Sequence, residues 1–203
     1  MSCVFSTSRA RAFTLIEVLV VMGLGMLILG VIHHFLMFTY RNVARNSAQA
    51  EMQQFSTLAM YRLEKELQQC DQGGVSWEKT PTFAALALHP VQEVTPTRHK
   101  KYRDQMAIYC WDVASGSFQR RTWGLGTLDI HQARRLTPAE FALIVFQPNG
   151  TVLCTSVVDF NLEMDGPPRY SQPLKLTMRL RRSVNSRDEV YRMERYVCLR
   201  NSL

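Results

Sequence analysis

The stretch that decides the fold reads RAFTLIEVLV and covers residues 11–20. A single carboxylate, Glu17, follows an abrupt change from polar to apolar sequence, and residues 18–32 after it carry no charge and no histidine. Insertion scales put a charged side chain at the centre of a membrane helix at about +2.5 to +3.5 kcal/mol. Glu17 lies near a helix end, where the cost is smaller, yet a carboxylate in such a segment still requires a reason.

The block FTLIEVLV, placed behind a short basic leader and ahead of a long apolar run, resembles the signature of type IV prepilins and type II secretion pseudopilins. The resemblance implies cleavage between Ala12 and Phe13, N-methylation of Phe13, and a role for Glu17 in registering subunits during assembly. The family usually has Gly before the cut, so Ala12 is a departure that implies slower cleavage. Glu17 of one subunit would meet the N-terminal amine of a neighbour, because a carboxylate in low dielectric is stabilised by an opposite charge.

Two simpler interpretations compete for the same segment. A secretory signal peptide has its small-residue cleavage site after the apolar run, whereas here one Ala-x-Ala triplet, residues 10–12, precedes the run and another, residues 48–50, lies well beyond it. A plain membrane anchor would be long enough, since 26 residues (13–38) make about 39 Å of helix and the hydrocarbon core is about 30 Å thick. A plain anchor explains the apolar run but leaves Glu17 without a role.

The helical pattern continues beyond the apolar run. Apolar residues recur every three or four positions from Ala48 to Cys70, with charged and amide side chains between them, and Gly73-Gly74 predicts a stop. We therefore expect a helix from about residue 13 to about residue 71. The predicted organisation is a leader (1–12), a transmembrane or filament-core helix (13–40), an amphipathic continuation (41–71) and a β-rich periplasmic body (72–203).

The remaining sequence predicts strands separated by turns, so the expected fold class is α+β and pilin-like, with the long N-terminal helix packed on an antiparallel body. Hairpins are predicted from residues 105–111 with 118–123, from 141–146 with 151–154 around Pro148-Asn149-Gly150, and from 157–163 with 174–180. Residues 189–200 form the expected last strand. Residues 82–88 fit a strand or a short helix, and residues 128–140 fit a loop or a short helix.

Residues 58–69, LAMYRLEKELQQ, the strands around residues 157–180 and the length of the body resemble the large minor pseudopilins of the J type. This resemblance implies a subunit at or near the tip of a type II secretion pseudopilus or type IV pilus, supporting protein secretion. It also implies an inner-membrane location, with a single span and the C-terminal body in the periplasm. The implied partners are other pilins or pseudopilins, the prepilin peptidase and methylase, the inner-membrane assembly platform and membrane lipid.

Four cysteines follow the leader, namely Cys70, Cys110, Cys154 and Cys198. Their even number allows two disulfides in an oxidising compartment, in any of three connectivities. The alternative is four buried free thiols, because cysteine is among the most frequently buried residues. No C-x-x-C pair is present, so neither a zinc ribbon nor a redox motif is expected.

The chain carries a formal net charge of +7. A basic cluster at Arg98, Lys100, Lys101 and Arg103 fits a solvated surface. It also allows an alternative function, in which the chain is a membrane-anchored binding module or a minor pilin that binds DNA for uptake. No H-E-x-x-H, G-x-S-x-G or phosphate-loop motif is present. We therefore expect no enzymatic activity, no cofactor and no metal.

Overall fold

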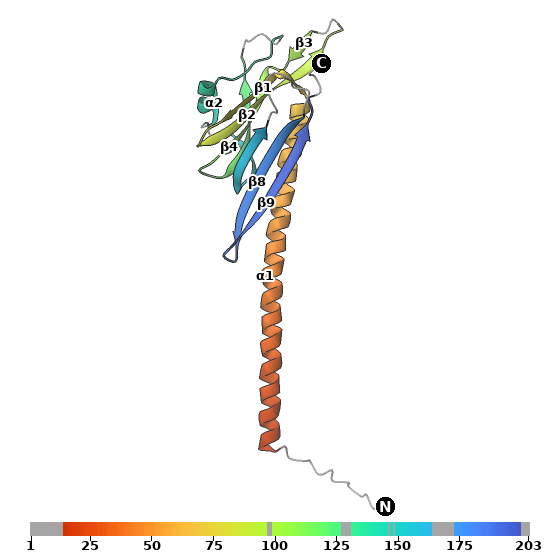
Figure 1. The fold of residues 1–203 in the computed structure, drawn as a ribbon, viewed down its shortest axis with the longest axis vertical. Coiled ribbons are helices and arrows are strands. Elements are labelled where there is room, and N and C mark those ends of the chain that lie inside the picture. The colour runs from red at the N-terminus through yellow and green to blue at the C-terminus, as the bar shows by residue number, and fades with distance from the viewer. Residues whose placement is uncertain are drawn as a thin grey trace, which may run out of the picture. The chain divides into compact units, whose positions relative to one another are not determined.

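The computed structural model describes residues 14–96, 99–126, 131–145, 147, 149–163 and 173–199. The chain divides into two compact units, Met1–Ala44 and Arg45–Leu203. The long helix α1 (Leu15–Gln68) contributes to both units, and every β-strand belongs to the second unit, here called the body. Figure 1 shows the order of the elements along the chain.

After α1, the body contains nine strands and one short helix among the described residues. In chain order these are β1 (Cys70–Lys79), β2 (Phe83–Val94), β3 (Lys100–Tyr102), β4 (Gln105–Asp112), β5 (Ser117–Gly124), α2 (Pro138–Val145), β6 (Thr151–Cys154), β7 (Val157–Glu163), β8 (Leu174–Val184) and β9 (Arg187–Val197).

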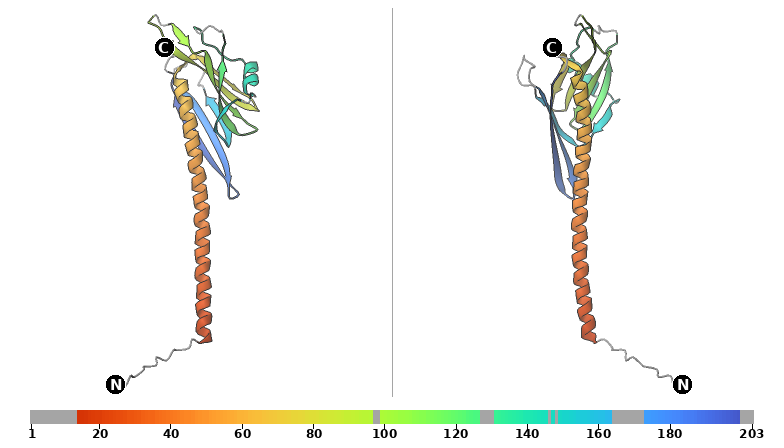
Figure 2. Two further views of the ribbon diagram at one scale, coloured as in Figure 1. Left: turned by 180° about the vertical axis from the view of Figure 1, so that it is seen from behind. Right: turned by 90° about the vertical axis from the view of Figure 1, so that its right-hand side faces the viewer.

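The strands form two sheets. The larger sheet has the order β1-β2-β4-β5-β6, with β3 paired to the far end of β2, and the smaller one has the order β7-β8-β9. Each recorded strand pair is antiparallel. Figure 2 shows both sheets beside the C-terminal part of α1. The expected α+β fold, a long N-terminal helix packed on antiparallel sheets, is confirmed.

The larger sheet is covered on both faces. Residues 82–88, whose sequence fits either a strand or a short helix, contribute to its strand β2. Alternate residues of a strand point to opposite faces. In β2, Ala84, Leu86 and Leu88 join the core shared with α1, whereas Ala85 and Ala87 join a second core under α2. A strand that is buried on both faces reads as a continuous apolar run, which is why the sequence alone did not separate strand from helix here.

The C-terminal part of α1 is the centre of the main core. Its buried side chains recur at helical spacing, and they contact the inner faces of both sheets. They are Ala48, Met52, Ser56, Ala59, Met60, Leu63 and Leu67. Ion pairs join the flanks of the helix to the strands: Glu66 pairs with Arg120 of β5 at 2.8 Å, Glu51 with Arg182 of β8, and Arg45 with Glu189 of β9 at 3.7 Å.

Two predicted hairpins are confirmed by the strand pairing. Strands β4 and β5 pair from Gln105↔Gly124 to Asp112↔Ser117, and the turn between them has Gly116 at φ +62°. Strands β7 and β8 pair from Val157↔Leu180 to Glu163↔Lys175. The connection between this second pair, residues 164–172, lies outside the described residues. The last strand, β9, begins at Arg187, slightly earlier than expected.

The predicted strand at residues 141–146 is wrong, because Pro138–Val145 form helix α2. The signal lay just upstream, where Thr137 and Glu140 form a capping box. The Thr137 N–H donates to Glu140 Oε2 at 2.8 Å, the Glu140 N–H donates to Thr137 Oγ1 at 3.4 Å, and Pro138 occupies the first helical position. Strand β6 therefore pairs with β5 and forms no hairpin with residues 141–146.

The helix stop predicted at Gly73-Gly74 is also wrong, since α1 ends at Gln68 and both glycines lie in β1. The chain leaves the helix because the Gln69 carbonyl accepts a hydrogen bond from the Val91 N–H at 2.9 Å, next to the pair Cys70↔Pro90. Gly74 serves a close backbone approach instead. A Cβ at this position would lie 2.6 Å from the His89 carbonyl oxygen.

His89 joins three segments of the body from a buried position. The Arg134 N–H donates to its Nδ1 at 3.0 Å, so Nε2 carries the proton and donates to the Arg103 carbonyl at 2.7 Å. The ring also packs on Tyr102, with ring centroids 4.9 Å apart. Burial, and secondarily the charge of Arg134, lowers the pKa of His89, whereas the Arg103 carbonyl and the Asp71 carboxylate oppose this effect.

The buried stripe of α1 gives a direct test of the core. Leu63 is 0% exposed and Leu58, on the same helix, is 64% exposed. We expect Leu63→Ala to lower the free energy of unfolding by about 2–5 kcal/mol, through lost burial and a cavity. The matched control Leu58→Ala should change it by about 0.5 kcal/mol or less. Chemical denaturation of the full chain in detergent micelles, followed by near-ultraviolet circular dichroism, measures both, and equal losses would contradict this core.

His89 predicts a pH dependence of stability. Because its pKa is lower in the folded chain than the unfolded value of about 6.5, its contribution is fully present above pH 6.5 and is lost as pH falls below that value. We expect the denaturant concentration at the unfolding midpoint to decrease as the pH is lowered from 8 to 5.5. In His89→Gln this decrease should be smaller. His99→Gln is the matched control, since His99 is exposed. An unchanged pH profile in His89→Gln would show that another group titrates.

Candidate functional site

Helix α1 begins with a hydrogen-bonded cap at Thr14. The Thr14 carbonyl accepts from the N–H groups of Glu17 and Val18 at 3.1 and 3.2 Å, and Thr14 Oγ1 lies 3.4 Å from the Glu17 nitrogen, which donates to it. Thr14-Leu15-Ile16-Glu17 therefore has the spacing of a capping box. The T-x-x-E pattern of residues 14–17 is the sequence signal for this cap, and Thr14 was not among the predicted site residues.

Glu17 lies in the first turn of α1 and its side chain is exposed. The first turn of a helix presents unpaired N–H groups and a partial positive charge, which favour a carboxylate there. Among the described residues, no salt bridge reaches Glu17. A cation for Glu17 must therefore come from a segment outside the described residues or from another molecule.

The first part of α1 is apolar around its whole circumference. From Leu15 to Tyr40 its large apolar side chains are exposed, including Leu19 at 60%, Leu27 at 64% and Phe35 at 65%. An 18-residue window in this helix has a mean hydropathy of 2.7, and the helix is long and apolar enough to cross a membrane. A helix that is apolar all round is stable only in lipid or inside an assembly. Length and composition alone would also fit a signal sequence, so the motif that precedes the helix matters.

The predicted processing site, Ala12 and Phe13, lies outside the described residues, and so does Arg98. The other predicted site residues are described. Glu17 lies in the first turn of α1, and the others belong to the body. Three of the cysteines lie in the cores of the body and Cys198 follows β9, whereas the basic residues lie in β3 or directly after it.

All four cysteines of the described residues are free in the structure. Cys70 and Cys154 lie in the core around α1, whereas Cys110 points into the second core under α2, on the opposite face of the larger sheet. Burial raises the pKa of the Cys154 thiol to about 11, and it also raises the pKa of Cys70 and of Cys110. These three thiols are therefore protonated and unreactive at neutral pH. Cys198 is exposed. Of the two alternatives, the structure shows free thiols, three of them buried, and no disulfide among these four residues.

The basic cluster is partly engaged within the body. Lys100 Nζ pairs with Asp71 Oδ2 at 3.1 Å, and Arg103 donates to Gln69 Oε1 at 3.3 Å. The Asp71 carboxylate also accepts from the Tyr102 hydroxyl at 2.6 Å and from the Gly74 N–H at 2.9 Å. Two of the predicted patch residues thus hold β3 against the start of β1. Lys101 also lies on β3, and its side chain is half-buried.

The described residues contain no group of three or more His, Cys, Asp or Glu side chains that could hold a metal ion. The N-terminal segment combines a basic leader sequence, a capped helix start and one carboxylate with a long apolar helix.

The comparisons with known proteins point to the same segment. A family model described as the prokaryotic N-terminal methylation motif matches residues 7–32. Neither the curated proteins nor the solved structures give a match to the chain. The matched range contains the capped helix start, Glu17 and the apolar run, and such a motif indicates processing by a prepilin peptidase. The chain thus carries a prokaryotic N-terminal methylation motif, of the kind found in prepilins, at the start of a pilin-like α+β fold.

Proposed function

We propose that this chain is a minor pilin or pseudopilin that assembles at or near the tip of a type II secretion pseudopilus or type IV pilus and supports protein secretion. The observation that carries the proposal is the methylation motif at residues 7–32, which leads directly into α1. The same helix continues into the body and supplies its core. One continuous element therefore has an apolar part for lipid or a filament core and a part that anchors a large body.

The proposed maturation has two steps. A prepilin peptidase hydrolyses the Ala12–Phe13 peptide bond, releasing residues 1–12 and leaving a free amine on Phe13. A methylase then transfers one methyl group from a sulfonium methyl donor to that amine. The N–C bond forms as the donor's S–C bond breaks, the donor leaves as a neutral thioether, and the methylated amine is cationic. We assign residues 13–40 to the membrane or filament core, the rest of α1 up to Gln68 to the amphipathic continuation, and the chain that follows to the periplasmic body.

The proposed role of Glu17 follows from its surroundings. It is exposed on an otherwise apolar helix, and no side chain described in the structure neutralises it. In low dielectric an unpaired carboxylate is costly, and an opposite charge within a few ångströms removes much of that cost. The methylated amine of a neighbouring subunit is such a charge. A subunit would then leave the bilayer only into a position where this pair forms.

The body supports a place at or near the tip. Two sheets and a second helix make it a large, β-rich unit, and we infer that such bulk is better tolerated where it is not repeated at every subunit. Its partners would be other pilins or pseudopilins, the peptidase and methylase, the inner-membrane platform and lipid. We also propose that the chain is a large minor pseudopilin of the J type. The DNA-uptake alternative has less support, because Lys100 and Arg103 already bind groups of the body.

Maturation is tested by the intact mass of the protein purified from native membranes. The expected species begins at Phe13 and carries one added methyl group. Replacing Ala12 with Gly should raise the processed fraction, because Gly is the usual residue in the family, while Ala12→Leu should abolish processing. A chain that retains residues 1–12 would favour a membrane-anchored module, and a chain that begins well after Phe38 would mean a secreted protein.

Assembly is tested by removing the carboxylate. Truncating one member of a buried ion pair costs about 3–5 kcal/mol, so Glu17→Ala and Glu17→Leu should reduce incorporation into filaments by roughly a hundredfold or more. Glu51→Ala is the matched control, because it deletes an exposed glutamate of the same helix within the body. Immunoblots of sheared filaments and of membranes measure both pools. Normal incorporation of Glu17→Leu would contradict the role proposed for Glu17. Improved membrane insertion of Glu17→Leu, with neither the variant nor the unaltered chain in filaments, would support an anchor that never assembles.

A further inference from the structure

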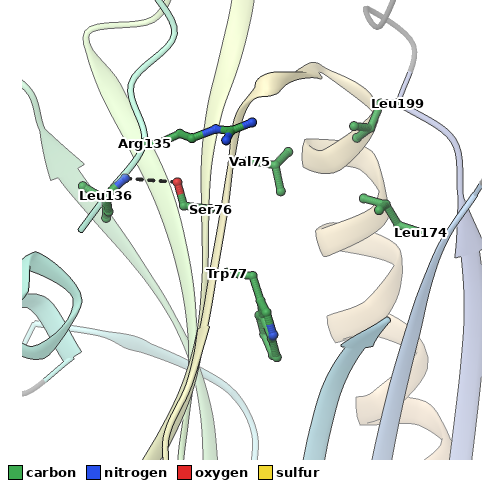
Figure 3. A pocket seen from close by; sticks show the side chains of 7 residues that line it. All are labelled: Val75, Ser76, Trp77, Arg135, Leu136, Leu174 and Leu199. Carbon is green, nitrogen blue, oxygen red and sulfur yellow. Dashed lines mark hydrogen bonds between the residues drawn. The ribbon is translucent and has the colours of Figure 1, made fainter. Parts of the chain in front are cut away.

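Residues 131–136, which lead into α2, form no helix or strand and are held to the body by hydrogen bonds. The Arg134 N–H donates to His89 Nδ1 of β2 at 3.0 Å, and the Leu136 N–H donates to Ser76 Oγ of β1 at 3.0 Å. Figure 3 shows the second of these bonds beside β1. Leu136 is buried, whereas the other side chains of this segment are exposed or half-buried. Few buried apolar groups therefore oppose a local opening here.

The bond between this segment and His89 requires a neutral ring. A backbone N–H can only donate, so His89 Nδ1 must be unprotonated to accept from Arg134. Nε2 then carries the proton and donates to the Arg103 carbonyl at 2.7 Å. A second proton, taken from the solvent, would form an N–H bond at Nδ1 and place two donors face to face. The bond from Nε2 would remain, because Nε2 is a donor in both forms of the ring.

We propose that His89 is a pH-sensitive switch, and that protonation of its Nδ1 releases residues 131–136 while β1, β2 and β3 stay paired. Release withdraws Arg135, which donates to the Gln72 and Gly73 carbonyls at 3.1 and 3.3 Å. These carbonyls lie at the start of β1, an edge strand of the larger sheet, which is then uncovered. The inference is independent of the proposed function.

On the side of β1 and β3, His89 faces the Asp71 carboxylate and the Tyr102 ring. The charge of Asp71, which also pairs with Lys100 at 3.1 Å, favours a protonated His89. Tyr102 packs on His89 with ring centroids 4.9 Å apart, and burial raises its pKa, so its hydroxyl stays protonated. An imidazolium at His89 therefore keeps an attractive neighbour after the segment has left.

On the side of the segment, His89 faces Arg134, whose positive charge disfavours a protonated ring. The Arg134 side chain pairs with Glu140 of α2 at 2.5 Å. The hydrogen bond from the Thr137 N–H, and secondarily that from Arg134, lowers the pKa of Glu140, so this carboxylate stays ionised between pH 7.5 and pH 5.5. Burial is the largest influence that lowers the pKa of His89. Burial and the charge of Arg134 thus both favour a neutral ring while the segment is bound.

The size of the effect follows from the two forms of the body. The closed form has no place for a proton at His89 Nδ1, whereas in the open form the ring meets water and its pKa approaches the ordinary value of about 6.5. The open form is therefore stabilised by proton binding as the pH falls below that value. Between pH 7.5 and pH 5.5 the equilibrium constant for opening should increase about tenfold.

The experiment measures backbone amide hydrogen exchange of the full chain in detergent micelles at pH 7.5 and pH 5.5, corrected for the intrinsic pH dependence of exchange. We expect the protection of the Arg134 and Leu136 amides to fall about tenfold at the lower pH. The amide of Ile108, a fully buried residue of β4, should keep its protection. This reference separates local release from global unfolding.

His89→Gln removes the titratable ring, while the glutamine amide can still accept from the Arg134 N–H and donate to the Arg103 carbonyl. The protection of residues 131–136 should then be equal at the two pH values. His131→Gln and His99→Gln are matched controls that should retain the tenfold change. His131 lies in the segment itself, and His99 is an exposed histidine elsewhere in the body.

Ring nitrogen chemical shifts of ¹⁵N-labelled histidine give a second test, which decides the matter if His89→Gln impairs folding. At pH 7.5 the His89 ring should carry its proton on Nε2 alone. Unchanged protection of Arg134, a parallel loss of protection at Ile108, or a pH dependence that persists in folded His89→Gln would overturn the inference. A ring that becomes protonated while the Arg134 amide stays protected would overturn it as well.

Discussion

Burial of the apolar stripe on the C-terminal part of α1 is the interaction on which the rest of the body depends. The inner faces of both sheets meet this stripe, and Met60, Leu63 and Leu67 are fully buried beneath them. The two sheets also contact each other directly. Trp77 makes an edge-to-face contact with Phe160 at 5.5 Å, and Trp111 Nε1 donates to the Val157 carbonyl at 3.0 Å. The helix and the inner faces of both sheets therefore share one core.

The two ends of α1 differ in burial: its C-terminal part is covered by the body, whereas its N-terminal part is exposed. From Arg45 onward the body supplies strands that bury one face and ion partners for the flanks. From Leu15 to Ala44 the described residues supply no cover for the apolar side chains and no cation for Glu17. Apolar surface of this extent requires lipid or other chains. The proposed passage from membrane to filament follows from that requirement, because both environments satisfy it and only the filament also offers a partner for Glu17.

Both α-helices that the structure describes begin at a T-x-x-E sequence pattern, which is the local signal for a helix start. Thr14 with Glu17, and Thr137 with Glu140, have the same spacing, and both begin helices. At the second box a strand was predicted in place of a helix. The following run, Phe141 to Phe146, has the composition of a strand and is followed by Asn149-Gly150, a common hairpin signal. Arg121, which donates to the Ile144 carbonyl at 2.8 Å from β5, completes the end of α2. A contact between residues so distant in sequence has no signature in the local pattern.

The sequence by itself determined the elements whose pattern is local: the apolar run with Glu17, the amphipathic period that follows, and the hairpins β4–β5 and β7–β8. It also determined the family signature. Only the tertiary structure decided where α1 ends, that residues 141–145 are helical, that the thiols are free, and that Lys100 and Arg103 face groups of the body. In each case the outcome depends on residues that are distant in sequence and meet only when the sheets form around α1. Val91 binds the Gln69 carbonyl where α1 ends, Arg121 binds the end of α2, and Asp71 binds Lys100. The sheet also separates Cys110 from Cys70 and Cys154, which lie on its opposite face.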